Sequence, residues 1–172
     1  DDERRAMLAA FRDRPGETSD GRRIIIEGNI GTPGDAVRVM ELGGEGVGMF
    51  RSEFLFMDRP DLPSEEEQFQ AYKKAVETMD GRPVIIRTLD IGGDKEVPAL
   101  DLEKEQNPFL GYRAIRICLD RTDLFLVQLR ALLRAARYGD LRIMFPMISS
   151  VDELRNAKQV LREARDLLDA EG

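Results

Sequence analysis

Four short apolar segments alternate with segments of helical spacing along this chain. The apolar segments are residues 24–29, 46–50, 83–88 and 141–147. Their lengths and their aliphatic residues are typical of buried strands. The helices expected after the second and fourth segments begin with capping boxes, formed by Ser64 with Glu67 and by Ser150 with Glu153. Because each helix must return the chain to the same end of the sheet, this alternation predicts parallel strands.

The predicted fold class is α/β, built from parallel (β/α) units. Four such units are about half of a TIM-type (β/α)₈ barrel, although an open doubly wound sheet has the same alternation. A short amphipathic helix over residues 3–12 and a polar linker over residues 14–21 precede the units. We therefore assign residues 1–21 to a helix and linker from a preceding region. Residues 22–172 are expected to be the N-terminal half of a barrel domain, truncated from a larger protein.

Two of the predicted strands end in an arginine. Arg51 follows the second strand and Arg87 lies at the end of the third, before a pair of glycines. The carboxyl ends of parallel strands share one edge, where ligands bind, and the guanidinium fork suits a phosphate or a carboxylate. The two arginines therefore suggest one anion site. The alternative is that Arg87 pairs with Asp90 or Asp94, and Arg51 with Glu53, as braces of the loops.

Composition excludes several function classes. With 26 basic and 33 acidic residues and a net charge of −7, the chain lacks the basic surface that general nucleic-acid binding requires. The absence of histidine excludes Ser-His and Cys-His nucleophiles, and a phosphohistidine on this chain. The single cysteine, Cys118, lies in an apolar helical stretch and is expected to be buried. No apolar run reaches the roughly 20 residues of a membrane span, so we expect no membrane insertion and a cytoplasmic location.

Four sequence blocks strongly resemble enzyme I of the bacterial sugar phosphotransferase system, the phosphoenolpyruvate–protein phosphotransferase. The blocks are GVGMFRSEFLFM (residues 46–57), RTLDIGGDK (87–95), NPFLGYRAIR (107–116) and RIMFPM (142–147). They look like the first half of the C-terminal barrel of that family, and the resemblance covers about residues 20–169 in order.

The resemblance implies a chemistry. Enzyme I takes the phosphoryl group of phosphoenolpyruvate onto a histidine of its own N-terminal domain and passes it to a small phosphocarrier protein for sugar uptake. It works as a homodimer with Mg²⁺. By resemblance, Arg51 and Arg87 hold the phosphate of phosphoenolpyruvate. Lys95 and Arg113 are further candidates for substrate binding at the same end of the barrel. For Arg113, bracing of the preceding loop is the alternative reading.

The family's other functional groups are expected outside this chain. Its metal-binding glutamate and aspartate and its acid cysteine belong to the second half of the barrel, and its phospho-accepting histidine belongs to an upstream domain. We therefore expect no catalytic residue and no metal ligand in this chain, which alone should be inactive. Asp90 and Asp94 are expected to be counter-ions rather than Mg²⁺ ligands. Cys118 lies on an early helix and is not equated with the acid cysteine.

The sequence is also compatible with two other functions. One is a barrel fragment of the pyruvate phosphate dikinase or phosphoenolpyruvate synthase type, which a nucleotide-grasp domain upstream would indicate. The other is a non-catalytic half-barrel that senses phosphoenolpyruvate or associates with itself, since an open half-barrel leaves two unpaired strand edges.

Overall fold

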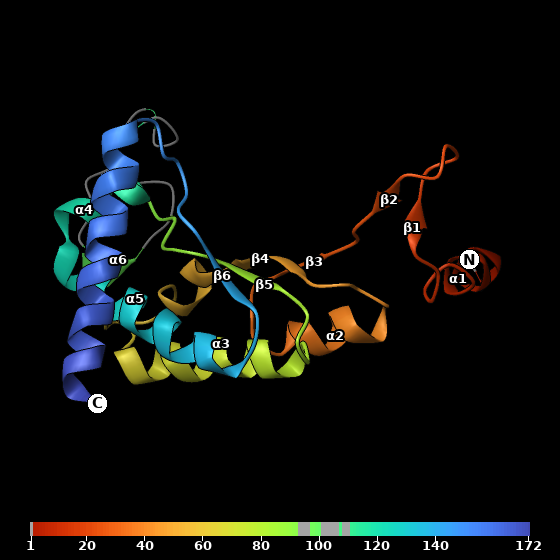
Figure 1. Cartoon of the computed structure of the whole chain (residues 1–172), viewed down its shortest axis with the longest axis horizontal. Helices are drawn as coiled ribbons and strands as arrows, with labels where there is room; N and C mark the ends of the chain where they lie inside the picture. Colours follow the sequence, from red (N-terminus) through yellow and green to blue (C-terminus); the bar gives the residue numbers. More distant parts are fainter. Residues whose placement is uncertain (1, 93–96, 101–106, 108–110) are drawn as a thin grey trace.

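The sheet at the centre of the chain is parallel, as the alternation predicts. The computed structural model describes residues 2–92, 97–100, 107 and 111–172. Its central strands are β3 (Gly28–Ile30), β4 (Val47–Arg51), β5 (Val84–Arg87) and β6 (Leu141–Met144). They pair in the order of the chain, β3-β4-β5-β6, and each pair is parallel. The predicted α/β class with parallel (β/α) units is confirmed, and the arrangement is consistent with a partial (β/α) barrel (Figure 1).

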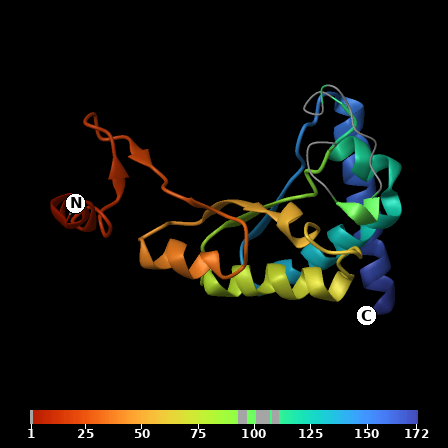
Figure 2. The same cartoon turned by 180° about the vertical axis from the view of Figure 1, so that it is seen from behind.

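Helices follow each of the central strands. The α-helices are α2 (Asp35–Glu41), α3 (Glu65–Thr78), α4 (Ile115–Asp120), α5 (Thr122–Ala135) and α6 (Val151–Glu171). Short 3-10 helices are η1 (Ser52–Leu55), η2 (Pro98–Leu100) and η3 (Ala136–Tyr138). Helices α2, α3 and α5 lie along one face of the sheet, and α6 stands beside α5 at its end (Figures 1 and 2). No helix within these described ranges has the length and apolar content needed to cross a membrane.

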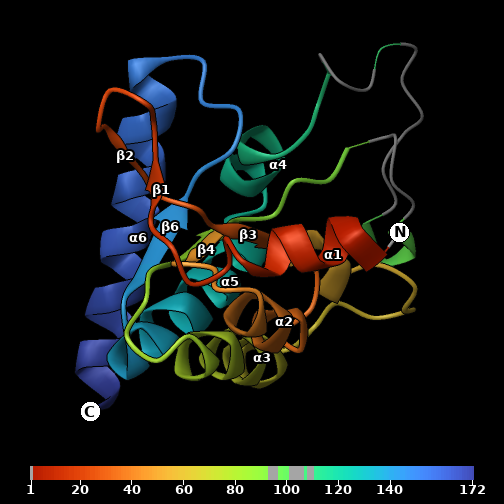
Figure 3. The ribbon, with the colours of Figure 1, turned by 90° about the vertical axis from the view of Figure 1, so that its right-hand side faces the viewer.

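The N-terminal region forms an arm that extends away from the sheet (Figures 1 and 2) and lies in front of it in the end-on view of Figure 3. It contains α1 (Asp2–Ala9) and a hairpin of β1 (Gly16–Glu17) with β2 (Arg23–Ile24). The prediction of a sheet strand over residues 24–29 is wrong in its first half. The register explains why: the parallel ladder with β4 begins at the pair of Gly28 with Val47, so the preceding isoleucines lie outside this ladder. Ile25 is 65% exposed, and Ile24 pairs with Gly16 in the hairpin instead.

The two predicted capping boxes are confirmed. The Ser64 hydroxyl accepts a hydrogen bond from the Glu67 amide at 3.2 Å, and the Glu67 carboxylate accepts one from the Ser64 amide at 2.7 Å. Ser150 and Glu153 form the same reciprocal pair at the start of α6. Each box satisfies two amides that would otherwise lack partners at a helix N-terminus.

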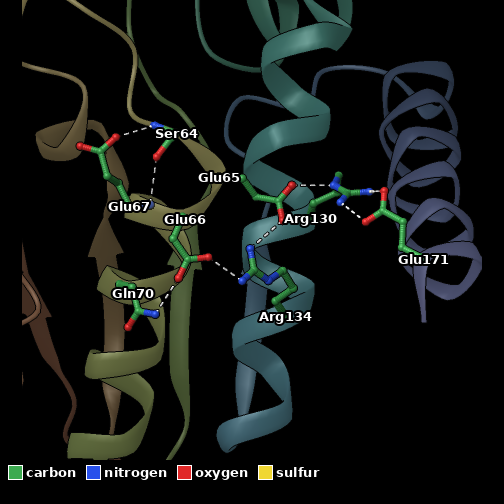
Figure 4. A network of polar contacts seen from close by, with 8 residues as sticks. All are labelled: Ser64, Glu65, Glu66, Glu67, Gln70, Arg130, Arg134 and Glu171. Carbon is green, nitrogen blue, oxygen red and sulfur yellow. Dashed lines mark hydrogen bonds and ion pairs between the residues drawn. The ribbon is translucent and has the colours of Figure 1, made fainter.

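Helix α5 is the centre of the helical layer, because it packs against both α3 and α6. Its apolar face is fully or almost fully buried and consists of Leu124, Phe125, Leu129, Ala131, Leu132 and Ala135. Its outer edge is tied to both neighbours by charge (Figure 4). Arg130 contacts Glu65 of α3 and Glu171 of α6, both at 2.6 Å, and Arg134 contacts Glu65 at 2.8 Å. These contacts hold α5 against α3 and α6.

Candidate functional site

Arg51 and Arg87 are the last residue pair of the β4–β5 ladder. The residues one position earlier, Phe50 and Ile86, are fully buried, and Phe50 packs edge-on against Tyr72 of α3. Because successive side chains of a strand point to opposite faces, both arginines lie on the face away from the helices. The structure thus brings these two predicted site residues side by side at the carboxyl edge of the sheet.

Arg87 is held firmly by two carboxylates. Its guanidinium forms one ion pair with Glu53 and another with Asp90 at 2.8 Å. The side chains of Arg87 and Glu53 are 16% and 2% exposed, so this contact is largely shielded from water. The Nε of Arg87 is buried and has no hydrogen-bond partner among the described residues. The guanidinium is therefore fixed in orientation while part of its donor capacity is unused.

Arg51 differs from Arg87 in both exposure and partners. Its side chain is exposed, and within the part of the chain that the structure describes it forms no ion pair. The alternative pairing of Arg51 with Glu53 is not what the structure shows, because Glu53 contacts Arg87. The site therefore combines one arginine with a fixed fork and one with freedom to turn toward a ligand.

Arg113 belongs to the same cluster. It is almost fully buried, and one of its terminal nitrogens lies 3.0 Å from the second carboxylate oxygen of Asp90. Asp90 thus bridges Arg87 and Arg113, which is the bracing role weighed for Arg113 from the sequence. The other candidate, Lys95, and the possible counter-ion Asp94 lie outside the described residues.

The charge of this cluster suits an anion better than a cation. The guanidiniums of Arg51, Arg87 and Arg113 outnumber the carboxylates of Glu53 and Asp90 by one. Both carboxylates are already committed to arginines. Among the described residues, no group of three or more His, Cys, Asp or Glu side chains could hold a metal ion. Fixed donors at a shielded site are what binding of a phosphate or carboxylate requires.

The sequence pattern did not point to one polar side chain behind these strand ends. Gln128 lies on the apolar face of α5 and is fully buried. It contacts the segments that follow both arginines, through the Ser52 hydroxyl and the Leu89 amide. A signal was present, since a glutamine among the leucines of a core-facing helix stripe must find hydrogen-bond partners.

Cys118 is buried, as expected from its apolar surroundings. Burial, followed by the negative charge of Asp90, raises the pKa of its thiol to about 12. The thiol keeps its proton at neutral pH and lies 3.9 Å from the carbonyl oxygen of Leu89. It is a core residue rather than a nucleophile.

The raised thiol pKa leads to a prediction for alkylation. A thiol reacts as thiolate, and a group whose folded pKa is raised holds less thiolate at pH 8 than it does in the unfolded chain. We expect native Cys118 to react with iodoacetamide at least about a hundredfold more slowly than in denaturant. Mass spectrometry of timed samples measures this ratio, and comparable rates in both states would contradict the assignment.

Nearly the whole chain is similar in sequence to known proteins. Residues 5–172 match the family model for PEP-utilising enzymes, PEP-binding domain. The chain is 56% identical over 170 residues to a phosphoenolpyruvate-protein phosphotransferase of Priestia megaterium, covering 99% of this chain and 30% of that protein. A Bacillus subtilis protein of the same name is 54% identical over 164 residues, which are 95% of this chain and 29% of the relative. The chain thus spans about 30% of the length of these curated relatives.

Proposed function

The chain belongs to the family of PEP-utilising enzymes, within their PEP-binding domain, and from this premise we propose that it forms part of a phosphoenolpyruvate site. The enzyme that we infer is a phosphoenolpyruvate-protein phosphotransferase, the name that the relatives from Priestia megaterium and Bacillus subtilis carry. Those names favour this activity over that of a dikinase. The chain is then the first half of the barrel domain, and it needs the remainder of the enzyme for turnover.

The observation that carries the proposal is the pairing of Arg51 with Arg87 at the ends of neighbouring parallel strands. Phosphoryl transfer depends mainly on positioning and on neutralising the charge of the phosphoryl oxygens. Arg87, fixed by Glu53 and Asp90, supplies a donor fork that needs no reorganisation when substrate arrives. Arg51 supplies a second fork that closes on the phosphate from the exposed side.

In this proposal the two arginines act at two stages of the reaction. They first hold the phosphate of phosphoenolpyruvate in line with the histidine that accepts it. They then stabilise the negative charge on the phosphoryl oxygens while the bond between phosphorus and the enol oxygen breaks and the bond to the histidine nitrogen forms. Arg113 supports Arg87 through Asp90 and also adds positive charge to the site. Lys95 remains a further candidate for contact with the substrate.

Mg²⁺ is part of the proposed enzyme, but the described residues of this chain do not fit it. Among the described residues, Glu53 and Asp90 are the carboxylates that contact Arg87, and both are engaged by guanidiniums. Hard cations prefer several carboxylate or carbonyl oxygens that are not shared with cations. The ligands of Mg²⁺ are therefore proposed to come from the part of the enzyme outside this chain.

We also infer the partners and the cellular location of the enzyme. The phosphoryl group passes from the enzyme's histidine to a phosphocarrier protein that serves sugar uptake, and the enzyme acts as a homodimer in the cytoplasm. The single, buried cysteine supports a reducing compartment.

The test is phosphorylation of the complete gene product. Incubation with phosphoenolpyruvate labelled in its phosphate, with Mg²⁺ present, is expected to give an acid-labile phosphohistidine and one pyruvate per phosphate bound. Parallel incubation with labelled ATP should leave the protein unlabelled. Labelling by ATP, or failure to bind phosphoenolpyruvate in a calorimetric titration, would reject the proposed function.

A further inference from the structure

The side-chain amide of the fully buried Gln128 forms hydrogen bonds through its oxygen and through both of its N–H groups. Its carbonyl oxygen accepts a hydrogen bond from the Leu89 amide at 2.9 Å, and its nitrogen donates to the Ser52 and Tyr72 hydroxyls, both at 3.1 Å. A buried amide destabilises the fold unless its donors and acceptor are paired. Here both N–H groups and the oxygen have partners, so the amide can lie in only one orientation.

The partners of Gln128 join the two strand ends that carry the arginines. Ser52 directly follows Arg51 at the end of β4, and its hydroxyl donates to the Arg87 carbonyl at 2.6 Å. Leu89 lies two residues beyond Arg87 on the loop after β5. The ladder between β4 and β5 ends at the pair Arg51 and Arg87. Beyond that pair, the hydrogen bonds of Ser52 and Gln128 hold the two backbones together.

The network is also anchored on its other side. Tyr72 of α3, which is fully buried, donates to Gln68 at 3.1 Å, and Gln68 donates to the Pro63 carbonyl at 3.0 Å. Burial raises the pKa of the Tyr72 hydroxyl, which therefore stays a neutral donor. Gln128 thus connects both strand ends to α3 as well as to its own helix, α5. A network in which every member is satisfied is rigid, because no hydrogen bond can move without breaking another.

We propose that Gln128 is a positioning residue for the phosphate site, holding the ends of β4 and β5 at the spacing at which Arg51 and Arg87 reach one phosphate. This inference rests on the proposed function. Gln128 is on the helix-covered side of the sheet and touches no substrate. Its effect is transmitted by the backbone on either side of the arginines. Small displacements of positioned donors have large effects on binding and catalysis.

The experiment uses two variants and two controls in the complete gene product. Gln128→Met keeps most of the side-chain volume but removes all three hydrogen bonds, and Ser52→Ala removes the bonds to Gln128 and to the Arg87 carbonyl. Leu132→Ala and Arg130→Met are the controls. Leu132 is a buried apolar residue of the same helix, and Arg130 belongs to the separate polar network with Glu65. Both controls alter the packing of α5 but lie outside the hydrogen-bond network of Gln128.

We expect Gln128→Met to raise the KM for phosphoenolpyruvate about tenfold or more, with Ser52→Ala following in the same direction. The effects of the two changes should be less than additive in the double variant, because both remove the hydrogen bond between Gln128 and Ser52. Hydrogen exchange of the Leu89 amide should accelerate about tenfold or more in Gln128→Met. Both controls should lower the unfolding temperature, yet leave the KM and the Leu89 exchange near those of the unmodified protein.

The outcomes separate this inference from the proposed function. If the unmodified protein uses phosphoenolpyruvate and both Gln128→Met and Ser52→Ala keep its KM within about twofold, Gln128 is structural only and the inference is overturned. Unchanged exchange at Leu89 in Gln128→Met overturns it as well. If the unmodified protein does not bind phosphoenolpyruvate, the proposed function fails, and the inference fails with it, whatever the variants do.

Discussion

Replacement of Arg87 with methionine in the complete enzyme is expected to lower kcat/KM for phosphoenolpyruvate by about a thousandfold or more. The guanidinium of Arg87 is fixed by Glu53 and Asp90 before any substrate arrives. Its loss removes both positive charge and preorganised donors from the proposed phosphate site. Arg87→Lys should retain part of the activity, with a loss of about a hundredfold, because lysine keeps the charge but cannot reproduce the planar fork.

Arg87 is also part of the fold, and this effect must be separated from the effect on catalysis. Its partner Glu53 is 2% exposed, so breaking this buried pair should destabilise the protein by about 3 kcal/mol. Adding Glu53→Gln to Arg87→Met removes the negative charge that faced the lost guanidinium. We expect the double variant to regain much of the unfolding temperature but none of the activity. Recovery of both would show that Arg87 acts only through stability.

Arg82→Ala is the matched control for the Arg87 variants. Arg82 lies just before β5, at the opposite end of the strand from Arg87, and its side chain is exposed. It has the same charge and belongs to the same segment, but it is at the amino edge of the sheet. It should change kcat/KM by less than about twofold. A loss equal to that of Arg87→Met would point to the overall charge of the protein rather than to a local site.

Features that depend on short stretches of sequence were predictable. The strand preceding Arg87 and the capping box of Ser64 with Glu67 are each set by a few consecutive residues, and both are present in the structure. The placement of Arg51 and Arg87 at neighbouring strand ends followed from the parallel topology alone. The strand prediction failed for the isoleucines before Gly28, because aliphatic content indicates a strand without indicating which strand pairs with it.

Features that depend on register between distant segments were not predictable. The pairing of Arg87 with Glu53 joins residues 34 positions apart, and it depends on how η1 turns after β4. The contact of Gln128 with Ser52 spans 76 positions and brings α5 behind β4. A sequence shows that a buried glutamine needs partners, but the packing of α5 against α3 determines which partners it meets. The electrostatic support of the site is therefore a property of the tertiary structure.

Arg51 offers the cleanest separation of substrate binding from folding. It is exposed, and among the described residues it forms no ion pair, in contrast to Arg87. Arg51→Ala is therefore expected to leave the unfolding temperature unchanged. In the proposed site it removes one of two forks that bind the phosphate, so kcat/KM for phosphoenolpyruvate should fall by about a hundredfold to a thousandfold. Initial rates of pyruvate release and a thermal melt of the same sample measure the two quantities.

The control for Arg51 is the next arginine along the chain. Arg59 lies on the loop between β4 and α3 and pairs with Glu67 at 3.0 Å, away from the strand end. Arg59→Ala removes the same charge from the same connection and should leave kcat/KM within about twofold. If Arg51→Ala also stays within about twofold, the phosphate is not bound between the two strand ends, and Arg87 alone would carry the site. A loss confined to Arg51 and Arg87 requires both forks to act on one phosphate, because the two residues share only the carboxyl edge of the β4–β5 ladder.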